Sequence, residues 1–62
     1  AHRTHAPAGA ATDRDAFDLA EERVLRQALA EHGGHRVRTA AALGIHKATL
    51  LRKMARHGIR YP

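Results

Sequence analysis

The chain of 62 residues contains no cysteine, tryptophan, serine or asparagine, and only one phenylalanine and one tyrosine. Without cysteine there is no disulfide and no thiolate metal ligand, and without cysteine or serine the commonest side-chain nucleophiles are missing. No apolar run approaches the roughly 20 residues that a membrane span needs, and no signal-peptide core is present. We therefore expect no enzyme activity, no cofactor, no small-molecule substrate and no membrane partner.

Acidic residues are also absent from the whole second half of the chain. Between Asp13 and Glu31 there are six acidic and three basic residues, a net charge of −3. From His32 to Pro62 there are seven basic residues and no acidic one, a net charge of +7. Basic residues without interspersed acids repel one another, so this half is typical of a surface that binds a polyanion such as nucleic acid.

The apolar pattern of the first half predicts one long helix, from about Asp15 to His32. A chain of this size buries only about 60% of its unfolded surface, so a helix of ~27 Å is long for the core available. We expect Gly33 and Gly34 to end the helix, one of them in the left-handed conformation. Part of its apolar stripe is then predicted to pair with a second copy of the chain, and the predicted dimerisation residues are Phe17, Ala20, Val24, Leu25 and Ala28.

Two shorter helices are predicted after the glycine pair. The first covers residues 36–43, and Gly44 turns the chain because a positive φ is easiest for glycine. The second begins at His46 or Lys47 and ends at His57. The predicted fold class is therefore all-α, with three helices, the last two forming a helix-turn-helix that follows a long dimerisation helix.

The third predicted helix has two distinct sides. Leu50 and Met54 point to the core on a helical wheel, and Leu51 falls at the edge of the apolar arc without an evident partner. The opposite side is continuous, polar and basic, and consists of Thr49, Arg52, Lys53 and Arg56.

This arrangement predicts binding to the major groove of double-stranded DNA, into which an α-helix fits. Lys47, at the start of the third helix, is predicted to donate to guanine O6 and N7, with His46 beside it. The start of the second helix adds free backbone N–H groups that attract anions. The predicted contacts to phosphate are Arg36, Arg38, Thr49, Arg52 and Arg56.

The first twelve residues show no apolar periodicity, and Pro7 interrupts any local helix. We interpret residues 1–12 as a flexible linker or an expression remnant, and residues 13–62 as the DNA-binding domain. Two pairs of histidines have HxxH spacing, His2 with His5 and His32 with His35. Two histidines alone do not make a stable zinc site, so no metal is expected.

A family resemblance is carried by residues 33–59, GGHRVRTAAALGIHKATLLRKMARHGI. This segment resembles the Fis-type helix-turn-helix of Fis itself and of the C-terminus of NtrC-type enhancer-binding activators, the partners of sigma-54 polymerase. With the preceding helix, the resemblance covers about residues 17 to 59. The matching elements are Gly33-Gly34, Arg38, Ala40-Ala41, Leu43-Gly44-Ile45, Thr49-Leu50, Arg52-Lys53 and Gly58-Ile59.

The resemblance implies a homodimer whose first helices pair and whose third helices enter successive major grooves. It implies a base contact for Lys47, and contacts to backbone or flanking bases for Arg38, Thr49 and Arg52. The chain departs from the family pattern at three positions. His35 stands where the family usually has Asn, and His46 where many members have Ser or Asn, so we expect weak caps at the starts of both short helices. Val37 stands where the family often has Ser or Thr, and valine cannot make the hydrogen bond to phosphate that such a hydroxyl would make.

We therefore expect sequence-specific DNA binding in bacterial transcription regulation, in the cytoplasm and associated with the nucleoid. The parent protein is predicted to be a sigma-54-dependent activator of the response-regulator kind, with any ATPase activity in other domains. Two alternatives stay open at this point. One is a free-standing Fis-like protein that bends DNA, and the other is a protein-interaction module that uses the first helix.

Overall fold

The computed structural model describes residues 13–61 and confirms the all-α class. Three helices follow one another: α1 (Asp13–Glu31), α2 (Arg36–Leu43) and α3 (Lys47–Arg56). α1 begins two residues earlier than predicted, with two aspartates in its first turn, where the helix dipole favours negative charge. The predicted linker, with His2 and His5, lies outside the described residues. None of the three described helices is long and apolar enough to cross a bilayer.

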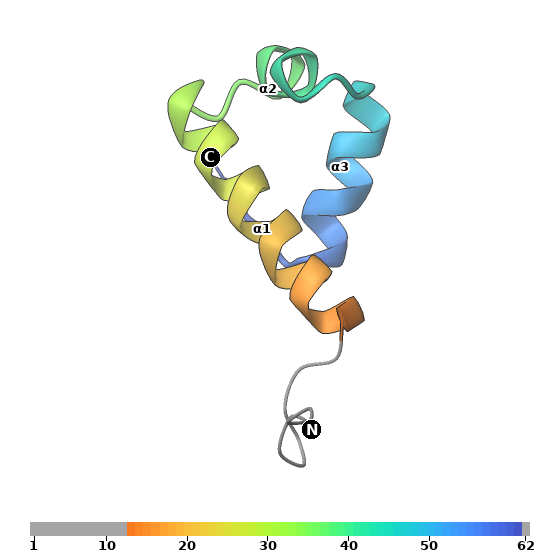
Figure 1. Ribbon diagram of the computed structural model, residues 1–62. Helices are drawn as coiled ribbons and strands as arrows, with labels where there is room; N and C mark the ends of the chain where they lie inside the picture. Colours follow the sequence, from red (N-terminus) through yellow and green to blue (C-terminus); the bar gives the residue numbers. More distant parts are fainter. Residues whose placement is uncertain (1–12, 62) are drawn as a thin grey trace, which may run out of the picture.

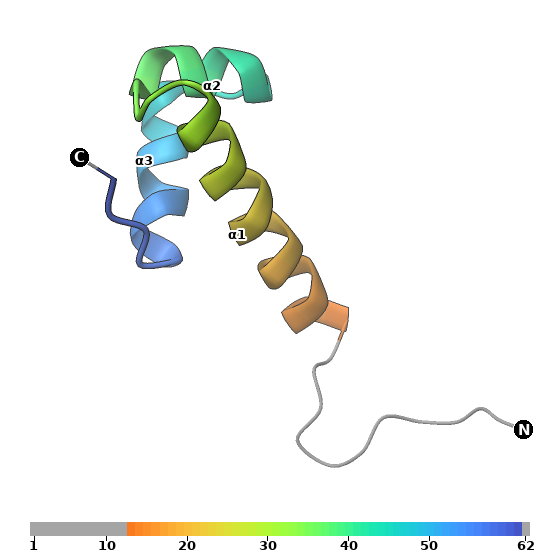
Figure 2. The same cartoon turned by 90° about the vertical axis from the view of Figure 1, so that its left-hand side faces the viewer.

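The helices are arranged so that α2 lies across one end of both longer helices (Figure 1). From that end α1 and α3 extend in the same general direction at an angle to each other, and Figure 2 shows that the start of α1 extends beyond the end of α3. The chain after α3 turns back along the helices toward the start of α2. The arrangement leaves one long side of α3 facing away from the rest of the domain.

Each helix ends in a glycine turn, as the sequence predicted. At Gly44, with φ of 72°, the backbone N–H groups of Gly44 and Ile45 donate to the carbonyls of Ala41 and Ala40 at 3.1 and 3.0 Å. This is the two-bond pattern of a Schellman cap. A Cβ at Gly44 would meet no atom within 4 Å, so the requirement for glycine comes from the backbone angle alone.

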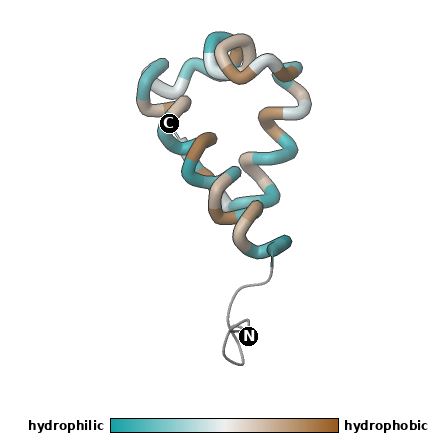
Figure 3. Tube along the Cα trace, in the orientation of Figure 1, coloured by the Kyte–Doolittle hydropathy of each residue, from teal (hydrophilic) through white to brown (hydrophobic). Residues whose placement is uncertain are grey.

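The core is small and lies where the three helices meet. Its members come from all three helices and from the turn after α3: Leu25, Leu29, Ala40, Leu50, Met54 and Ile59. The predicted roles of Leu50 and Met54 are thus confirmed. Apolar residues are interspersed with polar ones along every helix, and only a narrow side of each helix is buried (Figure 3).

The end of the chain is held more firmly than predicted. The guanidinium of Arg36 donates to the carbonyl of Gly34 at 2.5 Å and also to the carbonyl of Tyr61. Tyr61 is half-buried and packs against the core. These two hydrogen bonds give Arg36 a structural role, since they tie the end of the chain to the start of α2. They use two of the five guanidinium donors, and the phosphate contact of Arg36 stays a prediction.

Candidate nucleic-acid interface

The two short helices begin differently, although both have histidine at the cap position. The ring Nδ1 of His35 accepts a hydrogen bond from the backbone N–H of Arg38 at 3.2 Å. The buried Thr39 hydroxyl donates to the carbonyl of His35 at 2.7 Å and closes the same turn. His46 makes no side-chain cap. His35 therefore does cap α2, through a long hydrogen bond, whereas the predicted weak cap is confirmed at His46, which leaves the N-terminus of α3 with open N–H groups.

Four of the predicted DNA-contacting residues lie on the exposed parts of α2 and α3. Arg38 and Lys47 are exposed, and within residues 13–61 neither side chain makes an ion pair or hydrogen bond. Arg52 is also exposed, and its Nη2 donates to the hydroxyl of the half-buried Thr49 at 3.2 Å. This bond leaves the other guanidinium donors of Arg52 available.

The remaining basic residues of α3 are paired with the acidic residues of α1, which sequence reasoning missed. The ammonium of Lys53 lies 2.7 Å from a carboxylate oxygen of Glu21, and Arg56 Nη2 lies 2.7 Å from Asp18 Oδ1. The ring Nε2 of His57, just after α3, lies 2.7 Å from the second oxygen of Glu21. We call these three contacts the charge clamp.

The clamp engages Arg56 through one guanidinium nitrogen, Nη2, so a phosphate would compete with Asp18 for this side chain, and the phosphate contact of Arg56 stays a prediction. The signal was present in the sequence as two halves of opposite net charge. The net charges of the two halves do not by themselves predict these pairs, because pairing across 32 to 38 residues depends on how α1 and α3 pack. The free basic residues of the helix-turn-helix are thus fewer than its composition indicates.

Glu21 is the centre of the clamp, because each of its oxygens has its own partner. The hydrogen bond with His57 and then that with Lys53 lower the pKa of Glu21 from 4.5 to about 2. A carboxylate whose pKa is lowered by folding stabilises the fold above its ordinary pKa, and this stabilisation is lost as the pH falls from 4.5 toward 2.

We expect Glu21→Gln to lower the free energy of unfolding at pH 7 by about 1–2 kcal/mol, since two charge-assisted contacts are lost. The variant should also lose less stability than the parent chain between pH 5 and pH 2. Urea unfolding followed by circular dichroism across that range measures both effects. Glu22→Gln is the control, because Glu22 makes only an exposed pair with Arg26 at 2.9 Å. Equal pH profiles for Glu21→Gln and the parent chain would contradict the assignment.

The predicted dimerisation stripe divides into two groups. Phe17, Ala20 and Val24 are exposed, with Phe17 75% and Val24 51% accessible. Leu25 and Ala28 are buried within the single chain, which corrects their assignment to a surface open to a second copy. The reason is that α3 and α2 cover the C-terminal half of α1, where all of its buried residues lie.

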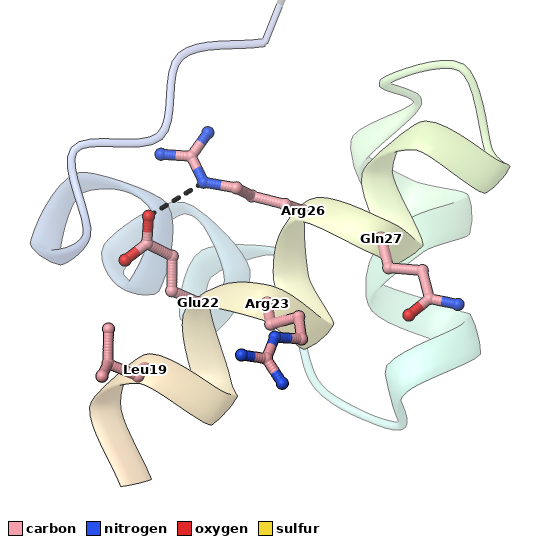
Figure 4. Close-up of a pocket in the computed structure, with 5 residues that line it drawn as sticks. All are labelled: Leu19, Glu22, Arg23, Arg26 and Gln27. Carbon is pink, nitrogen blue, oxygen red and sulfur yellow. Dashed lines mark hydrogen bonds and ion pairs between the residues drawn. The ribbon is translucent and has the colours of Figure 1, made fainter. Parts of the chain in front are cut away.

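A second side of α1 is exposed and mixed in character. Figure 4 shows five of its side chains, all from α1, with Arg26 bonded back to Glu22 one turn away; they are Leu19, Glu22, Arg23, Arg26 and Gln27. Leu19, which lies outside the predicted dimerisation stripe, is an exposed apolar residue of this side. Because this face has charged residues around a single leucine, it provides matched controls for the apolar stripe.

The described histidines do not form a metal site. Among the residues that the structure describes, no three of His, Asp or Glu lie close enough to hold a metal ion. His35 uses its Nδ1 for the cap of α2, and His57 uses its Nε2 for the clamp. Both histidines therefore serve the fold.

Comparison with known proteins agrees with this geometry. Searches of curated proteins and of solved structures gave no match. Residues 16–57, about two thirds of the chain, match the bacterial regulatory proteins of the Fis family. The matched segment spans most of α1, all of α2 and α3, and the residues of the charge clamp. This chain therefore belongs to the Fis family of bacterial regulatory proteins and carries its DNA-binding helix-turn-helix.

Proposed function

We propose that the domain binds double-stranded DNA sequence-specifically, with α3 in the major groove. The observation that carries this proposal is the exposed state of Arg38, Lys47 and Arg52 on two helices that contain no acidic residue. The side chains of Arg38 and Lys47 make no ion pair within the described residues, and Arg52 uses only one guanidinium nitrogen, on Thr49. Lys47 is the first residue of α3, and the first residues of such a helix reach base edges in helix-turn-helix proteins. Arg38 and Arg52 then hold the phosphates on either side.

A mobility-shift titration of the chain against duplex DNA at 50 and 200 mM salt tests this proposal. Each neutralised phosphate releases counterions, so the logarithm of the affinity should fall with the logarithm of salt by about 0.9 per phosphate held. Absence of any shift at 50 mM salt would overturn the proposal in favour of the interaction module.

Arg38→Ala should weaken binding to all duplex sequences about equally and reduce the salt slope by about 1, since one phosphate contact is lost. The same titration, repeated at four salt concentrations, gives the slope. Arg23→Ala is the matched control, because Arg23 lies on the outer face of α1 shown in Figure 4. A drop of equal size in both variants would indicate a general charge effect instead of a contact.

We further propose that the domain binds as a homodimer through the exposed stripe of Phe17, Ala20 and Val24. Three observations support a second copy here. The stripe is apolar, it lies beside the residues of the charge clamp, and a chain of this size gains burial by association. Pairing of α1 with its copy would place two α3 helices on one side of the dimer.

Phe17→Glu should shift the chain toward monomer in sedimentation experiments and weaken DNA binding, because a charge would be buried at the contact. Leu19→Glu is the control, since Leu19 is similarly exposed on another side of α1. If both variants sediment like the parent chain, with and without DNA, the stripe is not the dimer contact.

For the whole protein we propose a sigma-54-dependent activator of the NtrC type, acting in the cytoplasm at the nucleoid. The resemblance of residues 33–59 to the C-terminal domains of such activators supports this context. A free-standing DNA-bending protein is the other possibility within the family. The length of the chain encoded in the genome distinguishes them, because an activator requires a large ATPase domain before residue 13.

A further inference from the structure

One large apolar side chain of α3 is exposed, although it lies next to the buried side of the helix. Leu50 and Met54 are 0% and 5% accessible, whereas Leu51 is 43% accessible. Helical spacing places Leu51 on one stripe with two exposed alanines, Ala48 three residues before it and Ala55 four residues after it. The stripe is therefore apolar along two turns of the helix.

The surroundings of this stripe are basic. Lys47 and Arg52 flank it on α3, and both are exposed. No acidic residue occurs from His32 to the end of the chain, and the three acidic contacts from α1 reach the other side of α3 through Lys53, Arg56 and His57. A stripe edged by positive charge fits a polyanion better than the apolar surface of another protein.

The major groove offers one apolar group to such a stripe. Thymine carries a C5-methyl group there, and the other three bases present only donors and acceptors. Alanines on both sides of Leu51 add little bulk, so the helix backbone can come close to the base edges. Leu51 also lies one helical turn after Lys47. A side chain at that place would contact a base pair next to the one that Lys47 contacts.

We infer that Leu51 determines specificity by packing against the methyl group of a thymine in the bound site. Leu51 thereby selects an A·T base pair next to the one read by Lys47. This inference rests on the proposed placement of α3 in the major groove. Leu51 is exposed and does not belong to the core cluster, so packing of the core does not account for a leucine at this position.

Deoxyuridine provides a direct probe, because it pairs like thymidine and lacks only the methyl group. A duplex selected for tight binding from a random library is resynthesised with each thymidine in turn replaced by deoxyuridine. For the unaltered chain, one position should weaken binding about three- to sixfold, the effect expected for one buried methyl group. Leu51→Ala should bind the thymidine duplex with similarly reduced affinity and show no difference between thymidine and deoxyuridine at that position.

Two further variants show whether the effect belongs to Leu51. Leu51→Met retains a long apolar side chain and should retain the sensitivity to deoxyuridine. Val37→Ala removes an apolar side chain that is similarly exposed, but on α2, and should also retain it. Circular dichroism checks that all variants are folded.

The outcomes separate this inference from the proposed function. If no duplex is selected, the DNA-binding proposal fails. If a duplex is bound but every deoxyuridine substitution is neutral, or Leu51→Ala keeps the full penalty, the role of Leu51 is overturned while DNA binding stands. Loss of self-association in Leu51→Ala without any methyl effect would assign the stripe to a second copy of the chain and likewise overturn it.

Discussion

Leu50→Ala should unfold most of the domain at 25 °C, whereas Leu51→Ala should leave its stability within about 0.5 kcal/mol of the parent chain. Leu50 is completely buried, and truncating a buried leucine typically costs about 2–5 kcal/mol. A core of this size rarely supplies more than about 3–5 kcal/mol in total. Leu51 is 43% accessible and belongs to no buried cluster. Two adjacent leucines are thus expected to differ by almost the whole stability of the fold.

Thermal and urea unfolding of the two variants, followed by circular dichroism, measures this difference. Leu50→Val retains part of the side chain and should be folded but intermediate in stability, which keeps the comparison informative if Leu50→Ala does not fold. Equal losses in Leu50→Ala and Leu51→Ala would show that α3 is rotated about its axis from the orientation described.

Lys47→Ala should abolish most of the preference at one base pair of the bound site. A well-placed contact to guanine O6 and N7 is worth about 1–3 kcal/mol of discrimination, or roughly 5- to 150-fold. Affinity for non-specific duplex DNA should fall by no more than the loss of one phosphate contact would cause, because the other basic residues remain. Titrations against the selected duplex and its single-base-pair variants give both quantities.

Lys53→Ala is the matched control for Lys47→Ala, since both residues are lysines of α3. The ammonium of Lys53 is held by Glu21 at 2.7 Å, so its loss should lower stability slightly and leave base preference unchanged. If Lys47→Ala keeps affinity and preference, or if Lys53→Ala alters preference as much, Lys47 is not the reading residue.

The charge clamp divides the basic residues of α3 into two that are paired with α1, Lys53 and Arg56, and two that are not, Lys47 and Arg52. Asp18 and Glu21 bind the basic groups that face α1, and Lys47 and Arg52 are left facing solvent. Before Leu25, no residue of α1 is buried. Within the described residues, the first half of α1 is therefore joined to α3 through side-chain charge rather than through the core. We expect the mutual position of these two segments to depend on salt more than the core does.

Sequence alone determined the helices, their order and the turns between them. Apolar spacing of three and four residues, with a glycine after each segment, leaves little choice at that level, and the errors at helix ends were one or two residues. The pattern of residues 33–59 also identified the Fis-type helix-turn-helix that the family match shows. These features are local, since each depends on residues within a few positions of one another.

Only the tertiary structure decided which apolar and which basic side chains remain exposed and unpaired, and so available to a partner. Leu25 and Phe17 belong to one apolar stripe in sequence, but the packing of α2 and α3 buries the first and leaves the second exposed. Arg36 and Arg56 look like free basic residues, yet Tyr61 and Asp18, 25 and 38 residues away, hold their guanidinium groups. Burial and ion pairing are properties of neighbours in space, and a periodic pattern along one helix carries no information about the element packed against it.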